Sequence, residues 1–347
     1  MRPLGFLALL AVTALSVAGA GYALVSATLA TAPTADYGRP LFPDLAGRAN
    51  EATTVTVESA GAKVTLQRSD SGWGIAEKGG YPVATARVAK LVAGVAAVRL
   101  IEAKTAQPER YARLQVENLD QADAKSIRVT INDNAGQPLA AVLLGKPNYT
   151  LGGGASGLYV RQVGEAQSWL AEGSVEAPKQ AVDWVERTLL DLPADEVKQI
   201  VYTPAEGLAL TVAVSDPATA GYSLTPLPEG RSGDPTAVSG LTSLFGALQF
   251  DDVRPDKDAP PPIEAVETSS VGGLTLRAEL VELDSEIWAR LIASGSGDAA
   301  AKAAAVTKTT TGWLYKLPGH KMASFRPKLE DLLQPVPEPA PEPTTTP

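Results

Sequence analysis

The residue types that most often carry catalysis and metal binding are scarce in this chain. Its 347 residues include one histidine, His320, and no cysteine. Protein sites for zinc and related metals rely on thiolates and imidazoles, so we expect no metal site of this kind. A Ser-His-Asp triad would have to use His320, but no Gly-x-Ser-x-Gly sequence is present to expose a serine nucleophile. We interpret His320 as a solvated or capping residue.

Three glycines match the spacing Gly-x-Gly-x-x-Gly of dinucleotide-binding loops. They are Gly152, Gly154 and Gly157. That loop binds a pyrophosphate only where a strand precedes it and a helix N-terminus follows it. Here a predicted strand at residues 158–163 follows, so we interpret the glycines as a connection between strands and expect no cofactor.

The acidic residues form short pairs rather than a spaced set of ligands. The pairs are Asp251-Asp252, Asp256 with Asp258, and Glu330-Asp331. A calcium loop needs several oxygen ligands at fixed spacing around a central glycine, and no pair has this context. We interpret them as solvated surface residues. Two carboxylates that the fold brings together could still support hydrolysis, but nothing in the sequence selects a pair.

Five tryptophans offer flat rings on which a carbohydrate could stack. They are Trp73, Trp169, Trp184, Trp288 and Trp313. Each has apolar neighbours within a predicted strand or helix. Burial in a core is the more economical interpretation, because aromatic side chains dominate core burial. A groove for a glycan is the alternative.

The start of the chain indicates where the protein works. Arg2 precedes an uncharged stretch whose apolar part, residues 4–25, is 22 residues long, close to the ~20 that a helix needs to cross a bilayer. A cleaved signal peptide usually has an apolar core of only about 7–15 residues, so we predict a retained transmembrane helix. Positive flanks stay in the cytoplasm. We therefore expect a single-pass protein of a bacterial inner membrane, with a cytoplasmic N-terminus and its bulk in the periplasm.

Cleavage is the competing interpretation of this segment. Residues 18–20 (AGA) and 30–32 (ATA) both have the small-x-small form that a signal peptidase prefers. The lack of cysteine leaves neither a lipoprotein anchor nor a disulfide framework.

Composition fits an ordinary folded protein that does not bind nucleic acid. Hydrophobic residues make up 45% of the chain and charged residues 20%, close to globular averages. The net charge of −9 argues against nucleic acid and anionic lipid headgroups, because both require basic patches. The proline-rich residues 335–347 have nothing to bury, so we expect a disordered, extended tail there.

Hydrophobic periodicity predicts two similar passes of strands and helices. The first has strands at residues 63–67, 73–76, 126–133, 139–145 and 158–163, and helices at 84–101 and 178–192. The second has strands at residues 197–203, 208–214, 222–225, 274–283 and 313–317, and helices at 235–250 and 322–333. Residues 295–308 fit either a flexible insertion or an alanine-rich helix. Short turns between strands favour antiparallel hairpins with packed helices, which is an α+β fold.

The two passes have nearly the same offset at two landmarks. Val64 and Leu208 lie 144 residues apart, and the predicted closing helices end at residues 187–190 and 330–333, which are 143 apart. This predicts an internal duplication. We expect an anchor and linker at residues 1–35, similar α+β modules at 36–195 and 196–334, and the tail at 335–347.

Short motifs occur over nearly the whole region after the anchor. They are Asp36-Tyr37-Gly38, Leu41-Phe42-Pro43-Asp44-Leu45, Val64-Thr65-Leu66, Gly72-Trp73-Gly74, Gly80-Tyr81-Pro82, and residues 157–161 (GLYVR), 312–318 (GWLYKLP) and 330–333 (EDLL). Together they resemble the domain of unknown function 4340 family. Leu114-Gln115 departs from the Leu-Gly pair that members have after the tyrosine equivalent to Tyr111. The resemblance implies a membrane-anchored envelope protein that accompanies gliding-motility-type ABC transport components, with no known active site.

We therefore expect a non-enzymatic accessory protein that is the partner of an ABC-type transport complex in the membrane. The alternative is a periplasmic module that binds a glycan or another envelope ligand in a cleft between modules, where ligand sites often lie. No catalytic, cofactor-binding or metal-binding residue is assigned.

Overall fold

The computed structural model describes residues 36–149, 151, 156–216 and 221–335. The predicted anchor at residues 4–25, Gly152, Gly154 and nearly all of the predicted tail lie outside this part. No helix among the described residues has the length and apolarity needed to cross a membrane.

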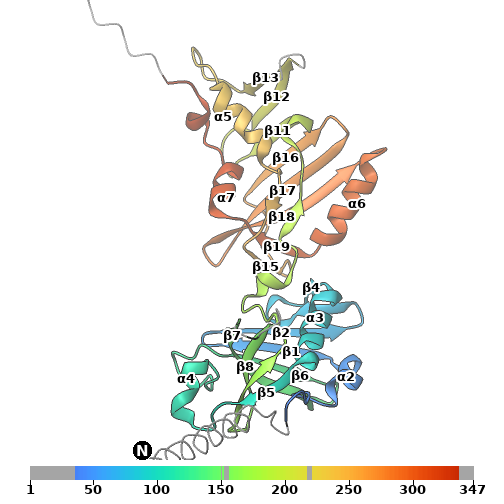
Figure 1. Cartoon of the computed structure of the whole chain (residues 1–347). Helices are drawn as coiled ribbons and strands as arrows, with labels where there is room; N and C mark the ends of the chain where they lie inside the picture. The colour runs from blue at the N-terminus through green and yellow to red at the C-terminus, as the bar shows by residue number, and fades with distance from the viewer. Residues whose placement is uncertain (1–35, 150, 152–155, 217–220, 336–347) are drawn as a thin grey trace, which may run out of the picture. The chain divides into compact units, whose positions relative to one another are not determined.

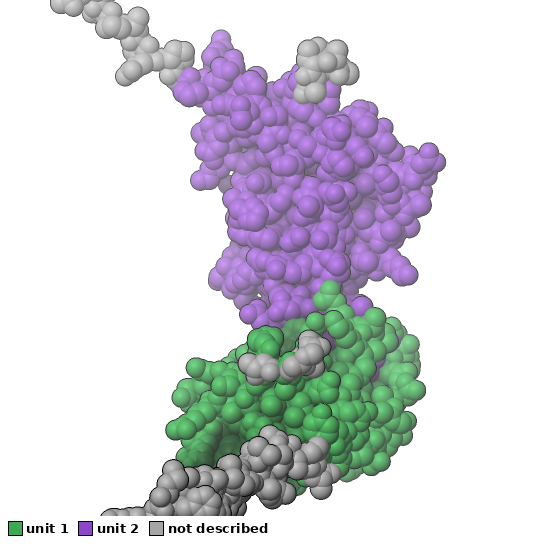
Figure 2. Space-filling model, viewed as in Figure 1, with its two compact units in different colours: residues 1–71, 85–179 green, residues 72–84, 180–347 purple. Residues whose placement is uncertain are grey.

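The chain divides into two compact units (Figures 1 and 2). Unit 1 comprises Met1–Ser71 and Thr85–Lys179, and unit 2 comprises Gly72–Ala84 and Gln180–Pro347. Both are built mostly from antiparallel strands with a few helices, as an α+β fold requires. The short segment Gly72–Ala84 belongs to unit 2, although unit 1 supplies the chain on both sides of it.

Unit 1 is an antiparallel sheet with a helix that buries one face. Its strands are β1 (Thr54–Ser59), β2 (Ala62–Ser69), β5 (Arg99–Ala103), β6 (Ile127–Asn132), β7 (Pro138–Asn148), β8 (Gly157–Gln162) and β9 (Ser168–Glu172). They lie in the order β2-β1-β6-β7-β8-β9-β5. Its helices are α2 (Leu45–Arg48), α3 (Thr85–Ala97) and α4 (Tyr111–Leu114). The longest, α3, buries Val88, Leu91, Val92 and Val95 at the three- and four-residue spacing of one helix face.

Unit 2 contains an eight-stranded antiparallel sheet, a separate strand pair and a hairpin. The hairpin consists of β3 (Gly72–Ile75) and β4 (Tyr81–Val83), which are the end strands of the nine-stranded sheet β4-β3-β2-β1-β6-β7-β8-β9-β5. The separate pair consists of β10 (Thr188–Leu190) and β14 (Leu248–Gln249). The main strands are β11 (Val197–Thr203), β12 (Leu210–Asp216), β13 (Gly221–Thr225), β15 (Asp252–Pro255), β16 (Glu264–Ser270), β17 (Leu274–Leu283), β18 (Glu286–Gly295) and β19 (Trp313–Lys316). They lie in the order β13-β12-β11-β16-β17-β18-β19-β15.

One face of this sheet forms the core of unit 2. Along β17, the buried residues Leu276, Ala278 and Leu280 alternate with residues on the other face, as the pleat of a strand requires. The helices are α5 (Pro235–Gly240), α6 (Ala299–Thr310) and α7 (Gly319–Phe325). Tyr315 is buried directly opposite Ala289 and donates its hydroxyl hydrogen bond to the backbone of α6 at 3.0 Å, which places the end of α6 on the core face.

The sheets of both units share one strand order. The order β2-β1-β6-β7-β8-β9-β5 in unit 1 matches β12-β11-β16-β17-β18-β19-β15 in unit 2 when ten is added to each strand number. In unit 1 the strand β5, which follows helix α3, lies at the edge of the sheet and pairs with β9, the last strand of the unit. In unit 2 the strand β15 pairs with β19 in the same way. The two sheets therefore share one topology over these seven strands.

Three of the predicted helices differ from the structure. The helix predicted at residues 178–192 is wrong, because this segment forms a short 3-10 turn at Ala181–Trp184 and then strand β10. Its pairing with β14, distant in sequence, overrides local propensity. The helix predicted at 235–250 stops after Gly240 and a 3-10 turn, and ends in β14. The helix predicted at 322–333 breaks at Arg326, since Pro327 follows and disfavours helical backbone before it.

Other segments refine the predicted pattern. Of the two alternatives for residues 295–308, the structure has the helix, α6. The helix predicted at 84–101 ends at Ala97, and strand β5 follows. Leu208, one of the repeat landmarks, precedes β12 and is 76% exposed. Six further strands have no counterpart among the predicted elements: β1, β4, β9, β15, β16 and β18.

Candidate functional site

The candidate binding site is a pocket of about 460 Å³ whose lining residues all belong to unit 2. Its walls come from β4 with Ala84, from β10 with the two residues Val185 and Glu186, from the last turn of α6, and from Trp313 at the start of β19. Most of these side chains are apolar. A largely apolar hollow with a few polar groups at its rim is the usual form of a ligand pocket.

Aromatic rings pack around Tyr81, one of the residues that line this pocket. The ring of Tyr81 makes edge contacts with Trp313 at 4.9 Å and with Phe250 at 5.8 Å between centroids, and Tyr315 lies 6.3 Å away. Burial raises the pKa of the Tyr81 hydroxyl, so the phenol stays neutral at physiological pH. Such edge-to-face packing gives the rings fixed positions.

A tight glycine turn brings Tyr81 to this place. The backbone of Gly79 and Gly80 has positive φ angles of 65° and 85°, which side chains disfavour. A Cβ atom on Gly79 would also collide with the ring of Pro255. The close approach of this turn to β15 therefore depends on glycine, and it sets the position of the pocket wall that β4 forms.

The backbone of β10 presents a strand edge to the pocket. Thr188 lies opposite Gln249 of β14, and the neighbouring Arg187 carbonyl accepts a hydrogen bond from Phe250 N at 3.3 Å. Because hydrogen-bonding groups alternate along an antiparallel strand, the N–H and C=O of Thr188 point away from β14. Thr188 N donates to Glu186 Oε1 at 3.4 Å, which is long for a hydrogen bond.

The edge of β4 has different chemistry. β4 is the outermost strand of its sheet, and its central residue is Pro82, opposite Gly74. Proline has no N–H, so the centre of this edge offers no donor to an added strand. Between β4 and β10, β10 is therefore the strand whose edge offers both a donor and an acceptor.

One acidic and one basic side chain, Glu186 and Lys308, lie at the rim of the pocket. Lys308 in the last turn of α6 is exposed and makes no ion pair with any described residue. Glu186 is also exposed, and its carboxylate accepts the Thr188 N–H. The lining also carries the hydroxyls of Thr188 and Thr309.

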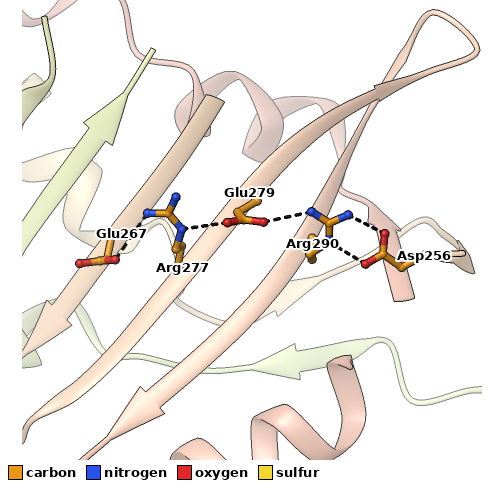
Figure 3. Close-up of polar contacts among 5 residues, drawn as sticks. All are labelled: Asp256, Glu267, Arg277, Glu279 and Arg290. Atoms are coloured by element: carbon orange, nitrogen blue, oxygen red, sulfur yellow. Dashed lines mark hydrogen bonds and ion pairs between the residues drawn. The ribbon is translucent and has the colours of Figure 1, made fainter. Parts of the chain in front are cut away.

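A ladder of five alternating charges crosses the other face of the sheet in unit 2 (Figure 3). Arg277 Nη1 lies 3.6 Å from Glu267, Arg277 Nε donates to Glu279 at 3.1 Å, and Arg290 Nη1 donates to Glu279 at 3.0 Å. Arg290 also binds both oxygens of Asp256, and these hydrogen bonds raise the pKa of its guanidinium. We call Glu267, Arg277, Glu279, Arg290 and Asp256 the charge ladder. Each of its charges has a partner, so its evident role is to hold strands together.

The predicted acidic pairs are not brought together into one site. Asp251 binds Arg187 at 2.6 Å, Asp252 binds Lys78 at 2.5 Å, and Asp256 belongs to the charge ladder. Asp258, Glu330 and Asp331 are exposed. Within the described ranges, no group of three or more His, Cys, Asp or Glu side chains is placed to hold a metal ion. His320 lies exposed on α7.

A buried carboxylate that the sequence did not single out lies at the start of β16. Glu264 is 7% exposed and accepts two hydrogen bonds from Arg326, at 2.6 and 2.9 Å, and one from Tyr202 Oη at 3.0 Å. Arg326 holds the pKa of Glu264 below its ordinary value. Burial and the bond to Glu264 raise the pKa of Tyr202 to about 12. Only the three-dimensional fold joins these residues, so no sequence pattern could reveal the cluster.

The tryptophans do not share a groove in the described structure. Trp73, Trp184 and Trp288 are buried. Trp169 and Trp313 are partly exposed, but Trp169 belongs to unit 1 and Trp313 to unit 2. Only Trp313 lines the pocket. Gly157, from the predicted glycine connection, is the buried first residue of β8.

The fold is thus an α+β protein with two large antiparallel sheets. A family model described as a domain of unknown function (DUF4340) matches residues 73–265, which is more than half of the chain. The chain belongs to this family. The match begins in the β3–β4 hairpin and includes the β4 and β10 walls of the pocket, but it ends before α6 and β19. No curated protein matches the chain.

Proposed function

We propose that this chain is a non-enzymatic accessory protein that stays anchored in a bacterial inner membrane and binds another protein through its periplasmic part. The observation that carries the proposal is the pocket of unit 2. It combines apolar walls with a strand edge, which are features that recognise a polypeptide, and its lining lacks a paired nucleophile and base.

The placement of the charged side chains supports a binding role over a catalytic one. The least exposed carboxylates of unit 2, such as Glu264, Glu279 and Asp256, are all bonded to arginines. Bonded in this way, they stabilise the sheet and its loops. A hydrolase that uses two carboxylates would need one of them to face a ligand cavity instead.

The proposed partner is a subunit of an ABC-type transport complex. Support comes from the family resemblance of the motifs and from the apolar segment at residues 4–25, since a protein that serves membrane subunits benefits from staying in the bilayer. A periplasmic module for a glycan or another envelope ligand remains the second candidate. It now depends on Trp313 alone among the tryptophans, because the other four lie outside the pocket.

Two measurements test the proposal. The protein should remain with membranes after salt and carbonate washing, and mass spectrometry of the mature protein should find the original N-terminus. Detergent extraction followed by affinity purification should recover transporter subunits in constant proportion. A mature N-terminus at Gly21 or Pro33 in a periplasmic fraction would refute the anchor, and repeated purification without transporter subunits would refute the partner.

Arginine substitutions in the apolar segment test the anchor, and a neutral substitution in the same segment supplies the matched control. Leu10→Arg and Leu15→Arg should each cost roughly 2.5–3.5 kcal/mol of insertion free energy near a helix centre. The double variant should fail to be exported and should lose the partner. A Ser16→Ala variant keeps the segment apolar, so its fractionation should match that of the original protein.

A further inference from the structure

The most complete recognition surface in the described structure is the strand edge of β10 where it enters the pocket of unit 2. We propose that this edge pairs with an extended peptide segment of a partner protein, and that one large apolar side chain of this peptide fills the pocket against Trp313. The inference rests on the proposed function, in which the chain binds another protein, and it specifies the chemistry of the contact.

The main chain of Thr188 supplies the pairing groups. Its N–H and C=O both point away from β14, so they match the C=O and N–H of one residue in an added antiparallel strand. In the structure this N–H donates to Glu186 Oε1 at 3.4 Å, which is long for a hydrogen bond. A peptide carbonyl would make a shorter bond and release the exposed Glu186 side chain to water.

The pocket beside this edge supplies the side-chain site. Strand addition usually combines main-chain hydrogen bonds with pockets for alternate side chains, since residues of a strand point to opposite faces in turn. A volume of about 460 Å³ is within the range of about 300–1,000 Å³ for small-ligand pockets. Trp313, Leu189 and Val83 give it aromatic and aliphatic walls, so a Phe, Tyr, Trp or Leu side chain is the expected occupant.

The residues around the pocket favour pairing at the edge of β10 and a peptide with an acidic residue beside its apolar one. Pro82 closes the centre of β4 to strand addition, which leaves β10 as the pairing edge. Lys308 makes no ion pair with a described residue and stands on the rim. A carboxylate flanking the apolar residue of the peptide would meet this ammonium group, so an acidic flank should improve binding in a salt-dependent way.

Synthetic peptides with a full methylation scan test the inference. The probes are fluorescein-labelled Thr-Val-Xaa-Val-Asp amides, with Phe, Tyr, Trp or Leu as Xaa, titrated against the full-length protein in detergent by fluorescence anisotropy. The tightest peptide is then N-methylated at one backbone nitrogen at a time. Methylation should weaken binding about tenfold at the one residue whose N–H meets the Thr188 carbonyl and leave the residues on either side unaffected, because neighbouring N–H groups of a strand point to opposite sides.

Protein variants locate the contact. Trp313→Ala should remove most of the affinity, and Thr188→Pro should weaken binding about as much as methylation does, because it removes the N–H that points to the peptide. The control is Ile292→Ala, since this 42% exposed residue of β18 does not line the pocket. Methylation acts on the peptide, so a folding defect in either pocket variant leaves this part of the test intact.

The outcomes separate the two proposals. Absence of binding by all four peptides up to millimolar concentration overturns the inference, and so does equal loss at every methylated position. Either result can stand beside successful co-purification with transporter subunits, in which case only the peptide contact fails. A loss confined to one methylated position, together with failed co-purification, would support the peptide contact and reject the transporter as its source.

Discussion

Arg290 on β18 binds both carboxylate oxygens of Asp256, with its Nε 2.6 Å from one and its Nη2 2.7 Å from the other (Figure 3). Asp256 lies just beyond β15, and the third nitrogen of the same guanidinium reaches Glu279 on β17. One side chain therefore joins the loop after β15 to two neighbouring strands. Bidentate pairs of this kind are among the stronger polar contacts in proteins.

Within the charge ladder, the pair Arg290–Asp256 should contribute more to stability than the pair Arg277–Glu267. The Arg290 side chain is 23% exposed, whereas the Arg277 side chain is 38% exposed and its partner Glu267 is 45% exposed. We expect Arg290→Met to lower the free energy of unfolding by about 2–3 kcal/mol, since it leaves the mostly buried carboxylate of Asp256 without its arginine, whereas Glu279 keeps Arg277. Arg277→Met should cost less than about 1 kcal/mol. Urea unfolding followed by tryptophan fluorescence measures both, and equal losses would contradict this ranking.

The cluster of Glu264, Arg326 and Tyr202, here called the Glu264 cluster, should make the stability of unit 2 sensitive to acid. Arg326 lowers the pKa of Glu264 in the folded protein below its ordinary value of 4.5. The stabilisation is therefore fully present above pH 4.5 and is lost as the pH falls through the lowered folded-state value. Glu264→Gln should remove this part of the acid sensitivity. Midpoints of urea unfolding between pH 3 and pH 7 test it, with the exposed Glu330→Gln as a control that should keep the original profile.

Gly145 on β7 should not tolerate a methyl group. A Cβ atom there would collide with the carbonyl oxygen of Leu114 and with the side chain of Val116. We expect Gly145→Ala to destabilise unit 1 by about 2–3 kcal/mol through overpacking. Gly47 on α2 has no atom within 4 Å of such a Cβ, so Gly47→Ala should be neutral or stabilising by up to about 1 kcal/mol. Thermal unfolding that ranks the two variants the other way would show that β7 can move aside.

The ring of Tyr81 should hold the β3–β4 hairpin in unit 2. Tyr81→Ala removes its contacts with Trp313 and Phe250 and should cost about 3–5 kcal/mol, as for other large aromatic residues in cores. Tyr81→Phe keeps the ring and should cost less than about 1 kcal/mol. Amide hydrogen exchange of residues 72–84 reports the hairpin directly. Unchanged protection in Tyr81→Ala would mean that other contacts hold it.

Sequence patterns predicted the elements that have a strong local period. The alternation in residues 274–283 gave the bounds of β17, and three- and four-residue spacing located α3. They failed where distant pairing decides the structure. Residues 188–190 look helical beside Val185 and Trp184, yet they form β10 because β14 pairs with them from almost 60 residues away.

The pocket had no local signal in the sequence. Its walls come from residues near Tyr81, Thr188, Lys308 and Trp313, which more than 230 residues separate from end to end. Tyr81 and Trp313 occur in the family motifs, but nothing in those motifs indicates that their rings touch. The Glu264 cluster was hidden for the same reason, because Arg326 follows it by 62 residues.

The division of the chain also has a consequence for the order in which the protein is made. The polypeptide passes from unit 1 to unit 2 after Ser71, returns at Thr85, and crosses again after Lys179. Synthesis proceeds from the N-terminus, so Tyr81 emerges long before Phe250, Trp313 and Tyr315, which later pack around its ring. Until then unit 1 must carry a hairpin with an unsheltered aromatic residue. A chain that stops short of β19 lacks Trp313 and Tyr315, so the Tyr81 ring of such a product stays without two of its three aromatic neighbours.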